Sequence, residues 1–142
     1  MVSPEMVEGL TIGYGFGELE PNTSQSIDNE TIFVKYAVGG FTLGYQMSET
    51  DGTVAAQEDE STGWGVTYAV NENFTIGYGE RDYDDDTSTT TKVEQNDKGF
   101  QASYTMGGMT IAGHMNENDN VDGSTAATAD KESYEFALTF AF

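Results

Sequence analysis

The chain has few residues with the side-chain chemistry of an active site. It contains one histidine, His114, and no cysteine, which excludes thiolate catalysis and disulfides. Ser103, His114 and an acidic loop residue could form a nucleophilic triad, because triad members need not follow one another in sequence. However, the sequence shows no motif that groups a nucleophile, a histidine and an acid. The sequence therefore predicts that the protein is not an enzyme, and we interpret His114 as a polar side chain on one face of a strand.

Two acidic stretches have the ligand types that calcium prefers. Ca²⁺ takes about six to eight oxygen ligands from carboxylates, amides and backbone carbonyls. The candidate ligands are Asp82, Asp84, Asp85 and Asp86 in one stretch, or Asp119 and Asp122 in the other. Neither stretch has the spacing of an EF-hand loop. The sequence leaves a weak calcium site open, beside the alternative of solvated loops whose charge resists aggregation, and it predicts no other cofactor.

Negative charge dominates the composition. The sequence holds 25 acidic and 5 basic residues, a net charge of -20, so nucleic acid is not expected as a partner. Of the 25 acidic residues, 21 lie in four polar tracts, 18–30, 49–60, 80–97 and 117–132. The segments between these tracts are almost free of charge. The uncharged segments are therefore the candidates for packed structure.

These uncharged segments repeat. Leu10-Thr-Ile-Gly-Tyr14 recurs at 41–45 and 74–78, and more loosely at 109–113. A polar tract and a second alternating run follow each copy, and a short link such as Gly39-Gly40 leads to the next. Gly-Gly links between alternating runs predict β-hairpins. We therefore predict an all-β, antiparallel up-and-down fold in a single domain over residues 1–142, with eight strands near 9–17, 31–38, 41–48, 63–70, 73–81, 98–106, 109–116 and 132–142.

One face of the expected strands is small and polar. A surface in contact with bulk solvent would carry Lys and Glu at many positions, but this face is nearly all Gly, Thr, Ser and Ala. Such residues suit the wall of a water-filled lumen. The residues predicted to line it are Thr11, Lys35, Thr42, Gln46, Thr67, Thr75, Gln101, Ser103, Thr105 and His114.

The other face is apolar and layered. Aliphatic residues such as Ile12 and Leu43 form a middle band, flanked by aromatic residues such as Trp64 and Tyr68. Aromatic rings prefer membrane interfaces, and about nine residues tilted by about 40° rise about 23 Å, near the apolar band of a transmembrane barrel. We predict that this face meets lipid. A soluble sandwich or lipocalin-like barrel is the alternative, but it leaves the uncharged second face unexplained.

The last expected strand ends the sequence on a row of alternating apolar residues: Tyr134, Phe136, Leu138, Phe140 and Phe142. Together with the repeated hairpins, the Gly-Gly turns and the acidic tracts, this row resembles the Gram-negative general porins, particularly the alphaproteobacterial type, over residues 7–142. The resemblance implies a bacterial outer-membrane channel for passive diffusion of small hydrophilic solutes, in contact with lipid and lipopolysaccharide and usually trimeric. It also implies that the terminal row is the signal read by the outer-membrane assembly machinery.

The expected strand number departs from that family, whose barrels have about sixteen strands. An eight-stranded barrel is just wide enough to be filled by side chains, and Gly, Thr and Ala would leave voids in it. We therefore expect the C-terminal half of a porin, or a short relative whose barrel is completed by another copy or chain. The alternative is a small closed eight-stranded outer-membrane barrel that acts as an adhesin or structural anchor through its acidic loops.

Charge and loops complete the expectations. Acidic mouths concentrate cations, so the channel is expected to be mildly cation-selective, with Lys35 and Arg81 as the main opposing charges near the wall. In the porin family a loop from the N-terminal half folds inward and narrows the pore. None of the polar tracts of this chain is predicted to do so.

Overall fold

The computed structural model describes residues 7–22, 25–53, 58–85, 93–126 and 128–141. Strands account for most of these residues, and one short 3₁₀ helix, η2, lies at Val121–Gly123. The strands are β1 (Leu10–Asn22), β2 (Gln25–Val38), β3 (Phe41–Gly52), β4 (Asp59–Ala69), β5 (Phe74–Asp85), β6 (Gln95–Met106), β7 (Met109–Asp119) and β8 (Lys131–Phe140). In this part of the chain no helix combines the length and apolarity needed to span a bilayer.

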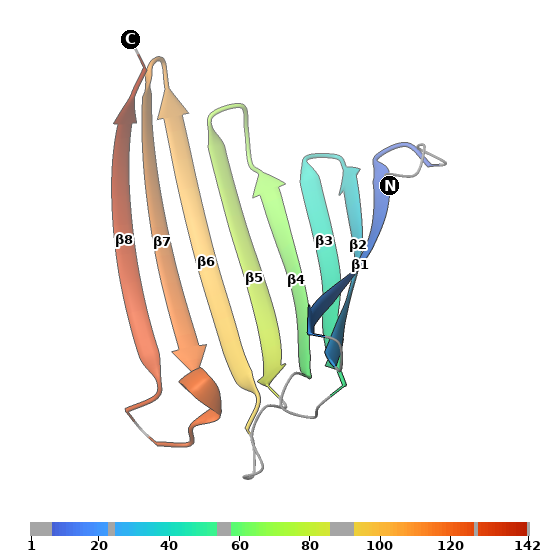
Figure 1. Ribbon diagram of the computed structural model, residues 1–142. Helices are drawn as coiled ribbons and strands as arrows, with labels where there is room; N and C mark the ends of the chain where they lie inside the picture. Colours follow the sequence, from blue (N-terminus) through green and yellow to red (C-terminus); the bar gives the residue numbers. More distant parts are fainter. Residues whose placement is uncertain (1–6, 23–24, 54–57, 86–92, 127, 142) are drawn as a thin grey trace.

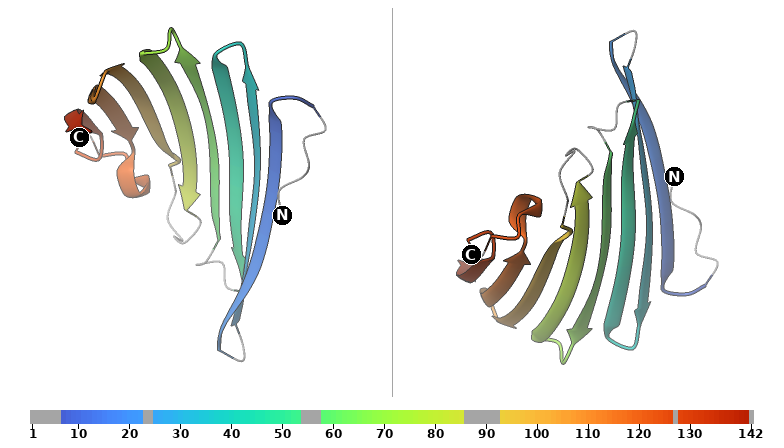
Figure 2. Two further views of the ribbon diagram at one scale, coloured as in Figure 1. Left: turned by 90° about the horizontal axis from the view of Figure 1, so that it is seen from above. Right: turned by 90° about the horizontal axis from the view of Figure 1, so that it is seen from below.

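Each strand pairs antiparallel with the next, so the eight strands form one up-and-down sheet in the order of the sequence. Figure 1 shows the strands side by side, and Figure 2 shows that the sheet curves across its width. Within the described residues β1 and β8 are both edges, because the sheet does not close on itself. The all-β, up-and-down prediction is confirmed, and the open, curved sheet has the form of a partial barrel.

The short links are tight turns, as their residues predicted. Gly39 and Gly40 both have positive φ, 56° and 87°, and join β2 to β3. Positive φ at two successive positions matches the twist of a hairpin, and glycine adopts it without strain. Between β4 and β5 the side-chain oxygen of Asn71 accepts hydrogen bonds from the backbone N–H groups of Asn73 and Phe74, at 2.9 and 3.0 Å. This Asx-type turn fixes the register of the two strands.

At the opposite end of the sheet the strands run further than expected. The prediction ended each strand where apolar alternation stops, yet β2 begins at Gln25 rather than near residue 31. The backbone ladder continues because polar side chains pair across it: Thr31 Oγ1 donates to Ser48 Oγ, and Thr50 Oγ1 donates to Asn29 Oδ1, both at 3.0 Å. Parts of the acidic tracts are therefore strand rather than loop, which corrects the expected bounds.

The sheet has almost no core of its own. Among the described residues, Ala129 is the single buried hydrophobic residue. Large apolar side chains are instead exposed, with Phe16, Tyr134 and Phe136 at 81%, 73% and 72%. Burying a large apolar side chain contributes about 1.5–3 kcal/mol, and a stable sheet needs many such contributions against chain entropy. Contacts between rings on the same face, such as Phe41 with Tyr68, leave these side chains largely uncovered, so the described chain by itself provides little apolar burial.

Candidate functional site: the concave face of the sheet

The register brings the predicted lumen residues together. Directly paired residues of antiparallel strands have side chains on the same face, and pairs such as Thr42 with Thr67 and Gln101 with His114 link neighbouring strands. We call the resulting surface the inner face. It carries all ten residues of the predicted set: Thr11, Lys35, Thr42, Gln46, Thr67, Thr75, Gln101, Ser103, Thr105 and His114. Their role in lining a lumen stays a prediction.

The inner face is the concave one. Figure 2 shows η2 within the curve of the sheet in both views. The backbone N–H of Asp122, in η2, donates to Gln95 Oε1 at 3.2 Å. Gln95 stands on the inner face, because it lies six residues before Gln101 on the same strand and side chains alternate along a strand. The small polar residues therefore line the inside of the curve, and the opposite, outer face is convex.

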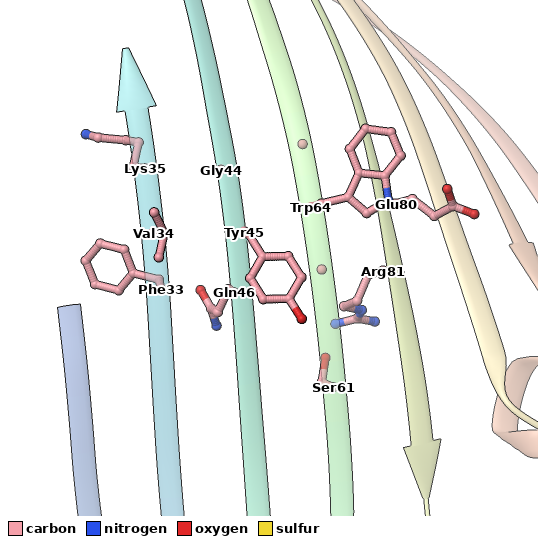
Figure 3. Close-up of a pocket in the computed structure, with 12 residues that line it drawn as sticks. Phe33, Val34, Lys35, Gly44, Tyr45, Gln46, Ser61, Trp64, Glu80 and Arg81 are labelled. Atoms are coloured by element: carbon pink, nitrogen blue, oxygen red, sulfur yellow. The ribbon is translucent and has the colours of Figure 1, made fainter. Parts of the chain in front are cut away.

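Two adjoining hollows of about 410 and 390 Å³ mark this face, and they share Lys35, Gly44 and Gly65. Figure 3 shows Lys35, Gln46 and other residues around the first. Nothing lies within 4 Å of the position that a Cβ would take at Gly44. Because glycine in a strand costs about 0.5–1 kcal/mol relative to alanine, packing alone does not explain this residue. Its effect is to leave open space above the inner face.

Phe33 is an inner-face residue that the sequence analysis missed. It pairs with Gly13 and Gln46, and its ring occupies the space that a side chain at position 13 would need. The run Ile32-Phe33-Val34 is apolar on both faces. Alternation therefore does not indicate that Phe33 belongs to the inner face. The absence of any side chain at Gly13 was the available signal, because a large neighbour can fill that space.

A polar network lies on the inner face near the end of the sheet opposite the Gly39-Gly40 turn. Arg81 forms an ion pair with Asp97, and Asn118 Nδ2 donates to Asp97 Oδ1 at 2.6 Å. Gln95 Nε2 donates to the same oxygen at 2.8 Å. The charge of Arg81 is thus offset locally by Asp97. Continuing the alternation into the acidic tracts would have placed these residues together, but the expected strands ended too early.

A row of carboxylates occupies the outer face beyond the aromatic rings. Glu30 pairs with Glu49, Glu49 with Glu60, and Glu60 with Asp84, across four strands. Like charges placed directly opposite one another destabilise a sheet, so counter-ions are expected to collect there. The acidic tracts were expected to surround a channel mouth as loops. The register instead turns much of their charge toward the outer face.

The first candidate calcium stretch lies partly in this row. Asp82 and Asp84 line an outer-face hollow of about 210 Å³ with Glu60 and Glu94. Burial, followed by the negative charges of Asp82 and Asp84, raises the pKa of Glu94 above its ordinary value. Asp85 ends β5, and Asp86 lies outside the described residues.

The second candidate stretch is divided. Asp119 Oδ2 accepts a hydrogen bond from Lys98 Nζ at 3.3 Å, whereas Asp122 belongs to η2. Over the described ranges, no three His, Asp or Glu residues are grouped so as to hold a metal ion. Calcium binding stays a prediction, and calorimetry with Ca²⁺ on the detergent-solubilised protein would test it.

The remaining candidate residues are placed as follows. Tyr134, Phe136, Leu138 and Phe140 all project from the outer face of β8, each exposed, whereas Phe142 lies outside the described residues. Ser103 and His114 share the inner face, but no hydrogen bond between them is found in the described part of the chain.

A family model described as Gram-negative porin matches residues 9–142. No curated protein and no solved structure matches the chain.

Proposed function

Because the chain belongs to the Gram-negative porin family, a family of outer-membrane channels, we propose that its sheet forms part of the wall of a water-filled pore. Small hydrophilic solutes diffuse through this pore passively. The inner face lines the water, and the outer face meets the acyl chains of the outer membrane.

The division of the sheet into two faces is the observation that carries this proposal. The outer face exposes a continuous set of large apolar and aromatic side chains, while the inner face is mainly small or polar, with Phe33 as an aromatic exception. In water such an outer face would be a large exposed apolar patch. In a bilayer the same face is solvated by lipid, and the aromatic rings sit at the interfaces.

The open edges support a pore wider than this sheet alone could enclose. A closed eight-stranded barrel is nearly filled by its own side chains, whereas many inner-face positions are Gly, Ser, Thr or Ala. We propose that further strands, from another copy of this chain or from additional sequence, pair with β1 and β8 to complete the barrel. A closed eight-stranded anchor or adhesin would require β1 to pair with β8, and the described register contains no such pairing.

The experiment is a measurement of native mass and of conductance in planar bilayers. We expect stepwise single-channel currents from a species heavier than one 15.4 kDa chain. The wider barrel would be excluded by a compact monomer that gives no conductance, and that result would favour the small anchor.

We propose mild cation selectivity for this channel. At inner-face positions of the register, three basic residues (Lys35, Arg81 and Lys131) stand against four acidic ones (Asp59, Asp85, Asp97 and Glu135), so local charges nearly balance. The net charge of -20 then biases the summed field toward cations. The cation preference is expected to be small, because the charges on the inner face nearly balance. Reversal potentials in a salt gradient measure it.

Lys35 provides a direct test of this selectivity. Lys35 is exposed on the inner face, and no hydrogen bond or ion pair of its side chain occurs in the described ranges. Lys35→Glu is therefore expected to move the reversal potential toward stronger cation preference. Lys98→Glu is the matched control, because Lys98 stands on the outer face, where it pairs with Asp119. Equal shifts from the two variants, or an anion-selective parent channel, would contradict the assignment.

The membrane supplies the other partners. We propose that the outer-face carboxylates contact the lipopolysaccharide layer through shared divalent cations, since both surfaces are anionic and the carboxylate row needs counter-ions. Assembly into trimers is also proposed, in keeping with the oligomers that the family generally forms.

A further inference from the structure

The first part of the connection between β7 and β8, residues 120–124, lies on the inner side of the sheet (Figure 2), although no tract was predicted to fold inward. Figure 2 shows its short helix, η2, within the curve in both views. η2 contacts β5 and β6, the two strands that carry Arg81 and Asp97. We call residues 120–124 the inner ledge.

Hydrogen bonds fix the ledge to the start of β6. Asn120 Nδ2 donates to the backbone oxygen of Glu94, and the N–H of Asp122 donates to Gln95 Oε1, both at 3.2 Å. Gln95 is itself held by Asp97, the residue that pairs with Arg81. A continuous set of polar contacts thus joins the ledge to the inner face of β5 and β6.

The far side of the ledge is held by the chain that returns to β8. The N–H of Asn120 donates to Asp130 Oδ1 at 3.1 Å, and the N–H of Val121 donates to the backbone oxygen of Ala129 at 3.3 Å. Ala129 is the buried hydrophobic residue of the described chain. These two hydrogen bonds and one buried residue therefore hold this side of the ledge in place.

The local sequence encodes this shape. Asn120, Asp122 and Gly123 have φ of 56°, 60° and 68°. Asparagine, aspartate and glycine are the residues that most readily adopt the left-handed conformation. Three such residues within four positions turn the chain sharply after β7.

The ledge also presents a charge. Asp122 is exposed, and in the described part of the chain its carboxylate has no hydrogen bond or ion pair. The nearby inner-face carboxylate of Asp97, by comparison, is engaged by Arg81 and Asn118. Within the described ranges, the charge of Asp122 is therefore not offset by a direct partner.

We propose that the inner ledge narrows the channel at the mouth opposite the Gly39-Gly40 turn. Asp122 is a selectivity-determining residue there, because permeating cations pass its negative charge. This inference rests on the proposed channel function. It adds a specific constriction and a specific charged residue, whereas the proposed function needs only a sheet that forms part of the pore wall.

The test uses the absence of cysteine from the chain. Asp122→Cys introduces one thiol on the ledge, and Glu117→Cys introduces one on the outer face of β7 with the same loss of negative charge. Each variant is assembled as the full chain and recorded in planar bilayers. One sample is treated with a negatively charged methanethiosulfonate, and a second sample with a positively charged one.

For Asp122→Cys we expect both reagents to lower the single-channel conductance in steps, because each adds bulk at the mouth. The positively charged reagent should also move the reversal potential toward anions, and the negatively charged one should restore cation preference. Glu117→Cys should show neither effect, with labelling of both thiols verified by mass spectrometry.

Unchanged conductance and reversal potential in labelled Asp122→Cys channels would overturn the inference while leaving the channel function intact. If the parent protein forms no channels at all, the proposed function fails and the inference fails with it. If Asp122→Cys does not assemble, Ser124→Cys places the thiol at the end of the ledge and should respond in the same two ways. Unchanged conductance and reversal potential in labelled Ser124→Cys channels would equally contradict the proposed role of the ledge.

Discussion

Leu43→Arg is expected to destabilise the protein in lipid by about 2–4 kcal/mol, the cost of arginine on the lipid face near the middle of a transmembrane barrel. Leu43 is half-exposed on the outer face, between Phe41 and Tyr45 on the same strand. Arginine there would have to place its guanidinium among acyl chains or distort the bilayer around it.

The adjacent residue supplies the control. Thr42 pairs with Thr67 on the inner face, and its replacement by arginine would put the charge in water. Thr42→Arg is therefore expected to cost less than about 1 kcal/mol and to reduce conductance or cation preference instead. The two variants differ by one position along the strand, so chain length, the introduced residue and the added charge are matched.

Unfolding of vesicle-reconstituted protein by guanidinium, followed through the fluorescence of Trp64, would measure both effects. Trp64 is the single tryptophan. A larger loss of stability for Thr42→Arg than for Leu43→Arg would mean that the faces are assigned the wrong way round, as in a soluble barrel with the aromatic residues inside.

Phe140→Asp is expected to prevent most of the chain from reaching the folded state in the outer membrane. Phe140 lies on the outer face of β8 and pairs with Met109. The substitution removes a side chain worth about 1.5–3 kcal/mol in an apolar environment and adds a carboxylate on the lipid side. It also interrupts the alternating row that, by resemblance to porins, is predicted to be read by the assembly machinery.

Thr139→Asp is the matched control, since Thr139 pairs with Thr110 on the inner face of the same strand. It adds the same carboxylate but leaves the aromatic row intact, so assembly should be close to that of the parent. The measurement is the heat-modifiable fraction recovered in the outer-membrane pellet. Equal recovery of the two variants would show that the row is not a signal.

In vitro refolding separates the two causes of a Phe140→Asp defect. If purified Phe140→Asp refolds into vesicles with a modest loss of stability but fails to assemble in cells, recognition is the impaired step. If it also fails to refold, the lost apolar contact accounts for the effect.

Much of the inner face could be predicted because alternation is a local property. Thr11, Thr42 and Thr75 open the repeated hairpins at equivalent positions, and turns such as Gly39-Gly40 hold neighbouring strands in the register that brings them together. A one-residue slip would move every side chain to the other face. The tight turns exclude this slip, so the face assignment followed from short-range signals.

The strand ends could not be predicted in the same way. Each strand is predicted to end where the apolar pattern stops, whereas the backbone ladder continues for as long as two strands stay within hydrogen-bonding distance. Residues such as Asp97 and Asn118 were therefore interpreted as parts of acidic tracts. Their contact across β6 and β7, and the outward row of Glu30 and Glu49, followed only from pairing between distant segments.

Residue alternation and turn chemistry act over a few neighbours, so the eight strands, their order and the two-faced character of the sheet are encoded locally. The extent of the strands, the face that receives the acidic residues and the position of the chain after β7 became clear only from the folded arrangement. Those features depend on contacts between residues far apart in the chain, such as Asp122 with Gln95. No local pattern specifies such contacts, because each needs the curvature of the whole sheet to bring its two partners together.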